Sequence, residues 1–388
     1  MSVNTMSFED ASAILNNIRT QVTGEDPITM LSTADFVSCG TTLLQAGADP
    51  VLNALMTTVT KVIFSVRPYS RKFGGLKVDS ETWGAIVRKL AVVDKPIEAD
   101  QEFNLVDGQS IDHYVVNKPE ILELKFYGAE TFAKSYTTFK DQLNSAFNSV
   151  GEFSSFVAMV VQNVSDMIEQ TFETISRMII ANYIGGKYAA SNGIIHALTE
   201  YNNEVGGSFT TTTIMDPDNF PNFAKWLYAR IATLTSLMTE RSQEFQIQVT
   251  GKELARHTPF ADQKVYLYAK FLNDMNARVL ADTYNYDFIK FADVEAVNYW
   301  QSIQTPMSID VTPNYLGTDG LVKTAAEQNI SGIIGVIFDR EALGYTVMNE
   351  WSATTPLNAS GGYWNTFFHY VMKWWVDYSE KGLVILFD

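Results

Sequence analysis

The most regular feature of the chain is a helical periodicity between residues 152 and 184. Apolar side chains recur there with a spacing close to 3.6 residues, at Phe153, Phe156, Val157, Val160, Val164, Met167, Ile168, Phe172, Ile175, Met178 and Ile179. Gly151 precedes the run, and Gly185-Gly186 supplies a stop signal after it. The pattern predicts one helix of about 50 Å, long enough to act as a strut.

Shorter patterns predict further elements on both sides of this helix. Helices are predicted near the N-terminus, where Ser7 can serve as the cap, and over 50–65, 221–240 and 272–280. Strands are predicted over 121–126, 245–249 and 265–269, and at the apolar C-terminal run 382–388. Interleaved helices and strands of this kind predict an α+β fold.

Residues 67–140 do not resemble a compact domain. Prolines and glycines alternate there with short strand-like runs, which predicts an extended hairpin. A two-stranded hairpin is marginal by itself, so it needs a surface to pack on. Two alternatives remain open: it folds back onto its own domain, or it lies across a neighbouring subunit.

The composition favours large protein–protein interfaces. The 388 residues are 46% hydrophobic and 13% aromatic but only 19% charged, and aromatic side chains anchor interfaces whose centres are depleted of charge. The length predicts two or three subdomains. The N-terminus lacks a signal-peptide pattern and no apolar run reaches the length of a membrane span, so we expect a soluble protein made in a reducing cytoplasm.

Charge is distributed unevenly. The net charge is −16, which argues against a nucleic-acid reader, yet residues 61–95 carry eight basic and three acidic side chains. One interpretation is a solvated basic loop. The other is an arm that lies on an acidic surface of a second subunit, with contacts made by Arg67, Arg71, Lys72, Lys77, Arg88 and Lys89.

No motif in the sequence predicts catalysis. Patterns for a nucleophile elbow, a zinc protease or a phosphate-binding loop are absent. Asp216 and Asp218 are interpreted as helix-capping residues rather than calcium ligands. The four histidines are scattered, and Cys39 is the single cysteine, predicted to be a small buried side chain. We therefore assign no catalytic, cofactor-binding or metal-binding residue and expect a protein that is not an enzyme.

The order of these parts resembles the major capsid (coat) proteins of tailed bacteriophages. Four segments are similar to those coats, most of all to the coats of small short-tailed phages: Arg71-Lys72-Phe73, the GEFSSFV run 151–157, the IIGVIFDREALG run 333–344 and Tyr363-Trp364-Asn365 with the aromatic residues that follow. Most of the chain follows the family's order of elements.

The resemblance implies the phage major capsid protein fold with an N-terminal arm, an extended loop, a peripheral domain and an axial domain. The ranges it implies are 1–66 for the N-terminal arm and helices, 67–140 for the extended loop, 141–205 for the peripheral domain with the spine helix at about 152–184, 206–330 for the axial domain and 331–388 for the return to the peripheral sheet. It also implies function: a subunit that self-assembles into an icosahedral shell around double-stranded DNA.

The implied partners follow from such a shell. They are further copies of the chain in hexamers and pentamers, a scaffolding protein and a portal, with packaged DNA touched only non-specifically and no membrane. The virion is the implied location, after assembly in the host cytoplasm. Two alternatives remain open from sequence: an encapsulin-type nanocompartment shell, and a cytoplasmic homo-oligomeric α/β enzyme whose site residues are dispersed.

Overall fold

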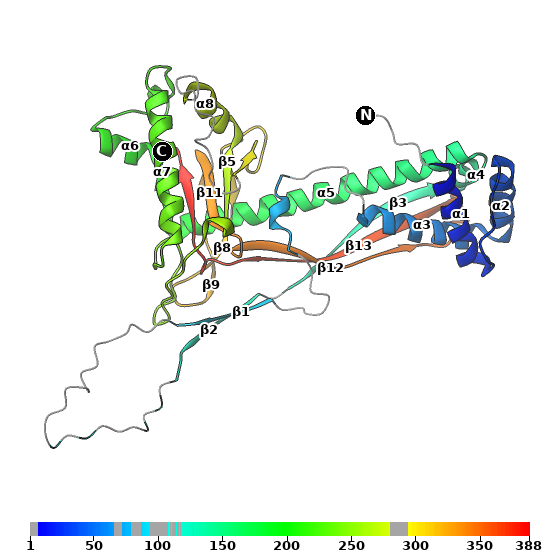
Figure 1. Ribbon diagram of the computed structural model, residues 1–388, viewed down its shortest axis with the longest axis horizontal. Coiled ribbons are helices and arrows are strands. Elements are labelled where there is room, and N and C mark those ends of the chain that lie inside the picture. Colours follow the sequence, from blue (N-terminus) through cyan, green and yellow to red (C-terminus); the bar gives the residue numbers. More distant parts are fainter. Residues whose placement is uncertain are drawn as a thin grey trace. The chain divides into compact units, whose positions relative to one another are not determined.

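The computed structural model describes residues 7–65, 72–78, 87–93, 108, 110, 114, 116, 118–126, 128–279 and 294–388 (Figure 1). Its α-helices are α1 (Phe8–Thr23), α2 (Thr33–Ala46), α3 (Ala48–Ser65), α4 (Lys140–Ala146), α5 (Val150–Ala189), α6 (Ala197–Val205), α7 (Phe220–Thr239) and α8 (Ala269–Val279). Its 3₁₀ helices are η1 (Gly74–Leu76), η3 (Thr213–Met215) and η4 (Phe260–Asp262).

Strands occur in the described residues from Val87 onward. They are β1 (Val87–Val92), β2 (Ile121–Phe126), β3 (Glu130–Phe139), β4 (Ile194–His196), β5 (Gln263–Tyr268), β6 (Val294–Val297), β7 (Ile309–Val311), β8 (Asn314–Leu316), β9 (Val322–Thr324), β10 (Gln328–Ile330), β11 (Ile333–Asp339), β12 (Leu343–Thr354), β13 (Tyr363–Val376) and β14 (Gly382–Leu386).

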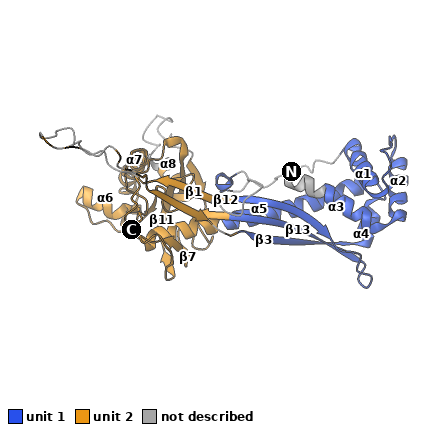
Figure 2. Ribbon diagram, turned by 90° about the horizontal axis from the view of Figure 1, so that it is seen from below, with its two compact units in different colours: residues 1–83, 129–175, 346–373 blue, residues 84–128, 176–345, 374–388 orange. Residues whose placement is uncertain are grey.

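The chain divides into two compact units, coloured in Figure 2. Unit 1 comprises Met1–Trp83, Ala129–Ile175 and Thr346–Lys373, and unit 2 comprises Gly84–Gly128, Ser176–Tyr345 and Trp374–Asp388. Each unit is thus assembled from three separate segments. The five ranges expected from sequence remain predictions about which segment plays which role.

Unit 1 combines the N-terminal helices, the first part of α5 and a three-stranded sheet in the order β12-β13-β3. Phe153 on α5 packs edge-on against Phe36 of α2, with 5.5 Å between ring centroids. On β13 the alternate side chains Trp364, Phe368 and Tyr370 are buried, because successive residues of a strand point to opposite faces. The other face of β13 carries His369, which stacks on Trp351 and is half-buried.

Unit 2 is built on a five-stranded sheet in the order β4-β14-β11-β5-β6. Its hydrophobic core covers one face of that sheet with α6, α7 and α8. Tyr183, from the last turns of α5, packs on the opposite face against Phe338 at 5.9 Å. Burial on both faces explains why β11 and β14 are continuous apolar runs rather than alternating ones.

The structure confirms most of the expected elements and corrects one. The long helix, the one helix predicted near the N-terminus (α1), the helices α3, α7 and α8, and the strands β2, β5 and β14 are present. The strand predicted over 245–249 is wrong. Phe245 has a φ of 66°, and its carbonyl accepts hydrogen bonds from Lys187 Nζ and the Gly382 amide. These bonds hold the start of the segment as a loop, and Val249 at its end forms an isolated bridge with Lys252 rather than part of a strand.

Candidate subunit interface

The candidate interface is the antiparallel hairpin formed by β1 and β2. Its register pairs Val92 with Ile121 and Leu90 with Glu123. Directly opposite residues of an antiparallel pair lie on the same face, and the face alternates along each strand. The hairpin therefore has two faces. We call the face that carries Lys89 the inner face, and the face that carries Leu90 the outer face.

The inner face is packed and the outer face is open. On the inner face Leu122 is buried, while Lys89, Ala91 and Leu124 are half-buried. On the outer face Leu90, Val92 and Ile121 are 57%, 63% and 51% exposed. The first two come from β1 and the third from β2, so the three form one apolar patch across the strands.

Arg88 and Lys125 add positive charge to the outer face. They face each other across the ribbon, and each forms an ion pair with Glu123. Their side chains stay 57% and 42% exposed. Because these basic side chains are partly exposed, they can also form ion pairs with a second surface at little cost of desolvation.

Lys89 differs from its neighbours because it points into its own chain. Its Nζ lies 3.1 Å from Asp377 Oδ2 and 3.2 Å from Glu341 Oε2, and it also pairs with Glu380. Burial lowers the pKa of Lys89, but the negative charges of Asp377 and Glu380 outweigh it and the net shift is upward. The ammonium therefore stays charged at neutral pH.

The remaining basic residues expected at the interface fall in several places. Lys72 precedes η1 and is exposed, and Lys77 follows η1 and is half-buried. Both belong to unit 1, whereas Arg88 and Lys89 belong to unit 2. Arg67 and Arg71 lie outside the described residues. The sequence did not identify the carboxylates that bind Lys89, because nothing local links β1 with a turn almost 290 residues away.

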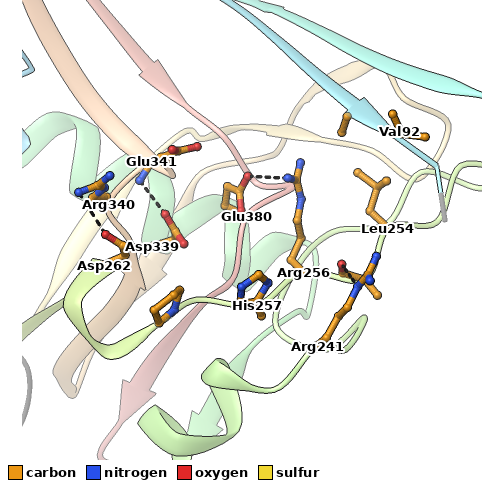
Figure 3. Close-up of a pocket in the computed structure, with 13 residues that line it drawn as sticks. Val92, Arg241, Leu254, Arg256, His257, Asp262, Asp339, Arg340, Glu341 and Glu380 are labelled. Atoms are coloured by element: carbon orange, nitrogen blue, oxygen red, sulfur yellow. Dashed lines mark hydrogen bonds and ion pairs between the residues drawn. The ribbon is translucent and has the colours of Figure 1, made fainter.

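A groove of unit 2 beside the hairpin is lined by charged residues from several loops (Figure 3). Asp262 pairs with Arg340 at 3.1 Å, and Glu380 pairs with Arg256 at 3.3 Å. Asp339 accepts a hydrogen bond of 2.8 Å from Thr258 Oγ1. Burial raises the pKa of Asp339, and it also raises that of Glu380 against the lowering effect of Lys89. These carboxylates are occupied by internal partners, so the groove is a structural ion-pair network.

Metal binding finds no support in the described part of the chain. No group of three or more His, Cys, Asp or Glu side chains there could hold a metal ion. Cys39 is buried, as expected, and burial raises the pKa of its thiol. Across the same residues, no helix combines the length and the apolar content of a membrane span.

Comparison with solved structures shows the fold. The capsid of Staphylococcus phage Andhra contains a similar chain, at 12% identity and a TM-score of 0.51, covering 82% of this chain and 84% of that one. The structure of the head fibre and inner core protein of native bacteriophage P68 contains another, at 11% identity and a TM-score of 0.51, covering 82% and 85%. The architecture is that of a phage capsid protein.

A family comparison extends this to function. The family model of the Phi29-like phage major capsid protein matches residues 12–378, and the chain belongs to that family. It is a structural subunit of a capsid shell, located in the virion, and it is not an enzyme. No curated protein matches the sequence. The encapsulin-type and enzyme alternatives are not favoured.

Proposed function

We propose that the chain forms the hexamers and pentamers of its shell by laying the outer face of the β1–β2 hairpin on a neighbouring subunit. The observation that carries this proposal is the exposed apolar patch of Leu90, Val92 and Ile121. Adjacent exposed apolar side chains mark an interaction surface. A two-stranded ribbon is also only marginally stable by itself, because it has no core of its own. Covering these side chains with a second surface would therefore stabilise it.

The charge distribution supports an acidic partner surface. Residues 61–95 carry an excess of positive charge, whereas the net charge of the whole chain is −16. We therefore propose that basic side chains of this part of the chain also contact the neighbouring subunit, namely Arg67, Arg71, Lys72, Lys77 and Arg88. Complementary charge of this kind steers association and fixes the register of the two surfaces.

The proposed partners beyond the chain itself are a scaffolding protein, a portal and packaged DNA. Acidic proteins repel phosphate groups on average, so the net charge of −16 supports only non-specific contact with DNA. An inner shell surface with low affinity for phosphate also lets DNA move during packaging and release.

The test replaces two residues of the outer face and compares them with a matched pair. In Leu90→Gln/Val92→Gln we expect the yield of closed shells, counted by electron microscopy, to fall by about tenfold or more. The control is Leu321→Gln/Val322→Gln, since these two apolar residues are 66% and 76% exposed on a different hairpin. An equal loss in both pairs, or none in the first, would contradict the proposal.

Lys72→Glu/Lys77→Glu tests the basic contribution. Its effect on the yield of closed shells should weaken at high salt.

A further inference from the structure

One ammonium group, that of Lys89, ties the inner face of the β1–β2 hairpin to two turns of unit 2. Lys89 contacts Asp377 and Glu380 from the turn between β13 and β14, and Glu341 from the turn between β11 and β12. The side chains of Asp377 and Glu380 are only 2% and 6% exposed. Two buried carboxylates and one half-exposed carboxylate thus converge on one lysine.

The turn that receives Lys89 is held in place from several sides. Asp377 Oδ1 accepts hydrogen bonds from the Ser379 amide at 2.8 Å and from Ser379 Oγ at 2.7 Å. The Asp377 amide donates to the carbonyl of Ala342 at 2.7 Å. These bonds fix Asp377 Oδ2 toward Lys89, so the acceptor for the ammonium is preorganised.

Lys89 is the cation that pairs directly with Asp377. Within the described residues, Lys89 is the one basic side chain at ion-pair distance from Asp377, whereas Glu380 also pairs with Arg256 at 3.3 Å. Removing the ammonium would leave a buried carboxylate without its direct ion-pair partner, and although the charge of Asp377 also acts on Lys187, such a loss is strongly unfavourable. The hairpin would then lose this polar attachment, and its inner face would be held by apolar side chains such as Ala91, Leu122 and Leu124.

We propose that Lys89 is a positioning residue that latches the hairpin onto its own subunit and so presents the outer face, already oriented, to the next subunit. This inference rests on the proposed function of the outer face. It assigns opposite roles to two adjacent residues of β1. Arg88 faces the neighbouring subunit, and Lys89 holds the hairpin in place within its own chain. Preorganisation favours association because less conformational freedom is lost on binding.

The test measures amide hydrogen exchange in the unassembled full-length chain. In Lys89→Met we expect the amides of 87–93 and 118–126 to exchange about tenfold faster or more, because the hairpin opens locally. The control is Lys125→Met, which makes the same chemical change on the outer face at a side chain that is 42% exposed. Exchange in these segments should stay unchanged in the control, and Lys89→Arg should restore most of the protection.

A second variant covers the case in which Lys89→Met does not fold. Glu341 is 61% exposed, so Glu341→Gln removes one contact of the latch without disturbing the core. We expect a smaller acceleration of about two- to threefold in the same segments. Unchanged exchange in both variants would overturn the latch.

Shell yield separates this proposal from the proposed function. Faster exchange together with fewer shells supports both. Faster exchange with a normal shell yield supports the latch and counts against the assembly role of the hairpin. Normal exchange with fewer shells overturns the latch and indicates that Lys89 acts across the interface.

Discussion

Trp364 and Asp49 are 315 residues apart in the chain, yet the indole Nε1 donates a 2.6 Å hydrogen bond to Asp49 Oδ1. Trp364 is fully buried on β13, and Asp49 lies in the first turn of α3. The bond joins the N-terminal helices of unit 1 to its three-stranded sheet. It also satisfies a buried donor that would otherwise be costly.

We expect Trp364→Phe to lower the free energy of unfolding by about 1.5–3 kcal/mol, the usual range for a hydrogen bond to a charged group. Urea unfolding of the unassembled chain measures the change. Asp49→Asn keeps an acceptor at the same place and should lose less. A Trp364→Phe chain as stable as the parent would show that the bond contributes nothing.

Gly382 begins β14 at a point where a side chain does not fit. A Cβ at this position would lie 1.9 Å from Tyr183 Oη and 3.0 Å from Phe338 Cβ. Tyr183 cannot easily move aside, because its ring stacks on Tyr378 with 5.5 Å between centroids. Gly382→Ala should therefore destabilise the chain by about 1–3 kcal/mol, as overpacking does.

Gly151 provides the matched control for that substitution. It lies in the first turn of α5, and a Cβ there would meet only Ser149 Oγ at 3.9 Å. Gly151→Ala should leave stability unchanged or raise it by up to about 1 kcal/mol, since alanine has the higher helix propensity. Equal losses in the two variants would mean that the tight contact at Gly382 does not limit stability.

Lys187 makes the stability of the chain depend on pH. The side chain is fully buried, and burial lowers its pKa to about 7 although the charge of Asp377 opposes this. In the unfolded chain its pKa is about 10.4. The folded state thus binds fewer protons than the unfolded state between these two values, and this residue makes stability rise with pH across that interval.

The measurement compares the parent chain with Lys187→Met by urea unfolding at several pH values. The free energy of unfolding of the parent, relative to that of the variant, should rise by up to about 1.4 kcal/mol per pH unit between pH 7 and 10. Comparing two chains removes the contribution of every other titrating group that is unaffected by the substitution. A difference independent of pH would contradict the expected loss of charge.

Secondary structure was predictable where one element obeys a single periodicity. The helix expected over 152–184 is α5, Val150–Ala189, and the expected cap at Ser7 accepts a hydrogen bond from the Asp10 amide. α2 was missed although its start carries a readable signal, a capping box formed by Ser32 and Asp35. The position of His369 followed from strand alternation, since β13 places it on the half-buried face with Trp351.

The basic character of the extended segment was likewise readable from the sequence, but the direction of each side chain was not. Arg88 and Lys89 are adjacent and chemically alike, and the sequence assigned both to a neighbouring subunit. Only the strand register separates them, because consecutive residues of a strand face opposite sides.

By itself, the amino-acid sequence determined the long helix, the apolar terminal strand and the basic segment, since each depends on residues close together in the chain. It also determined the family likeness, which depends on the order of such segments. Tertiary structure alone decided which distant groups meet: Trp364 with Asp49, Phe245 with Lys187, and Lys89 with Asp377. Such contacts depend on how the sheets and helices pack, and no local propensity encodes the distance between residues far apart in the chain.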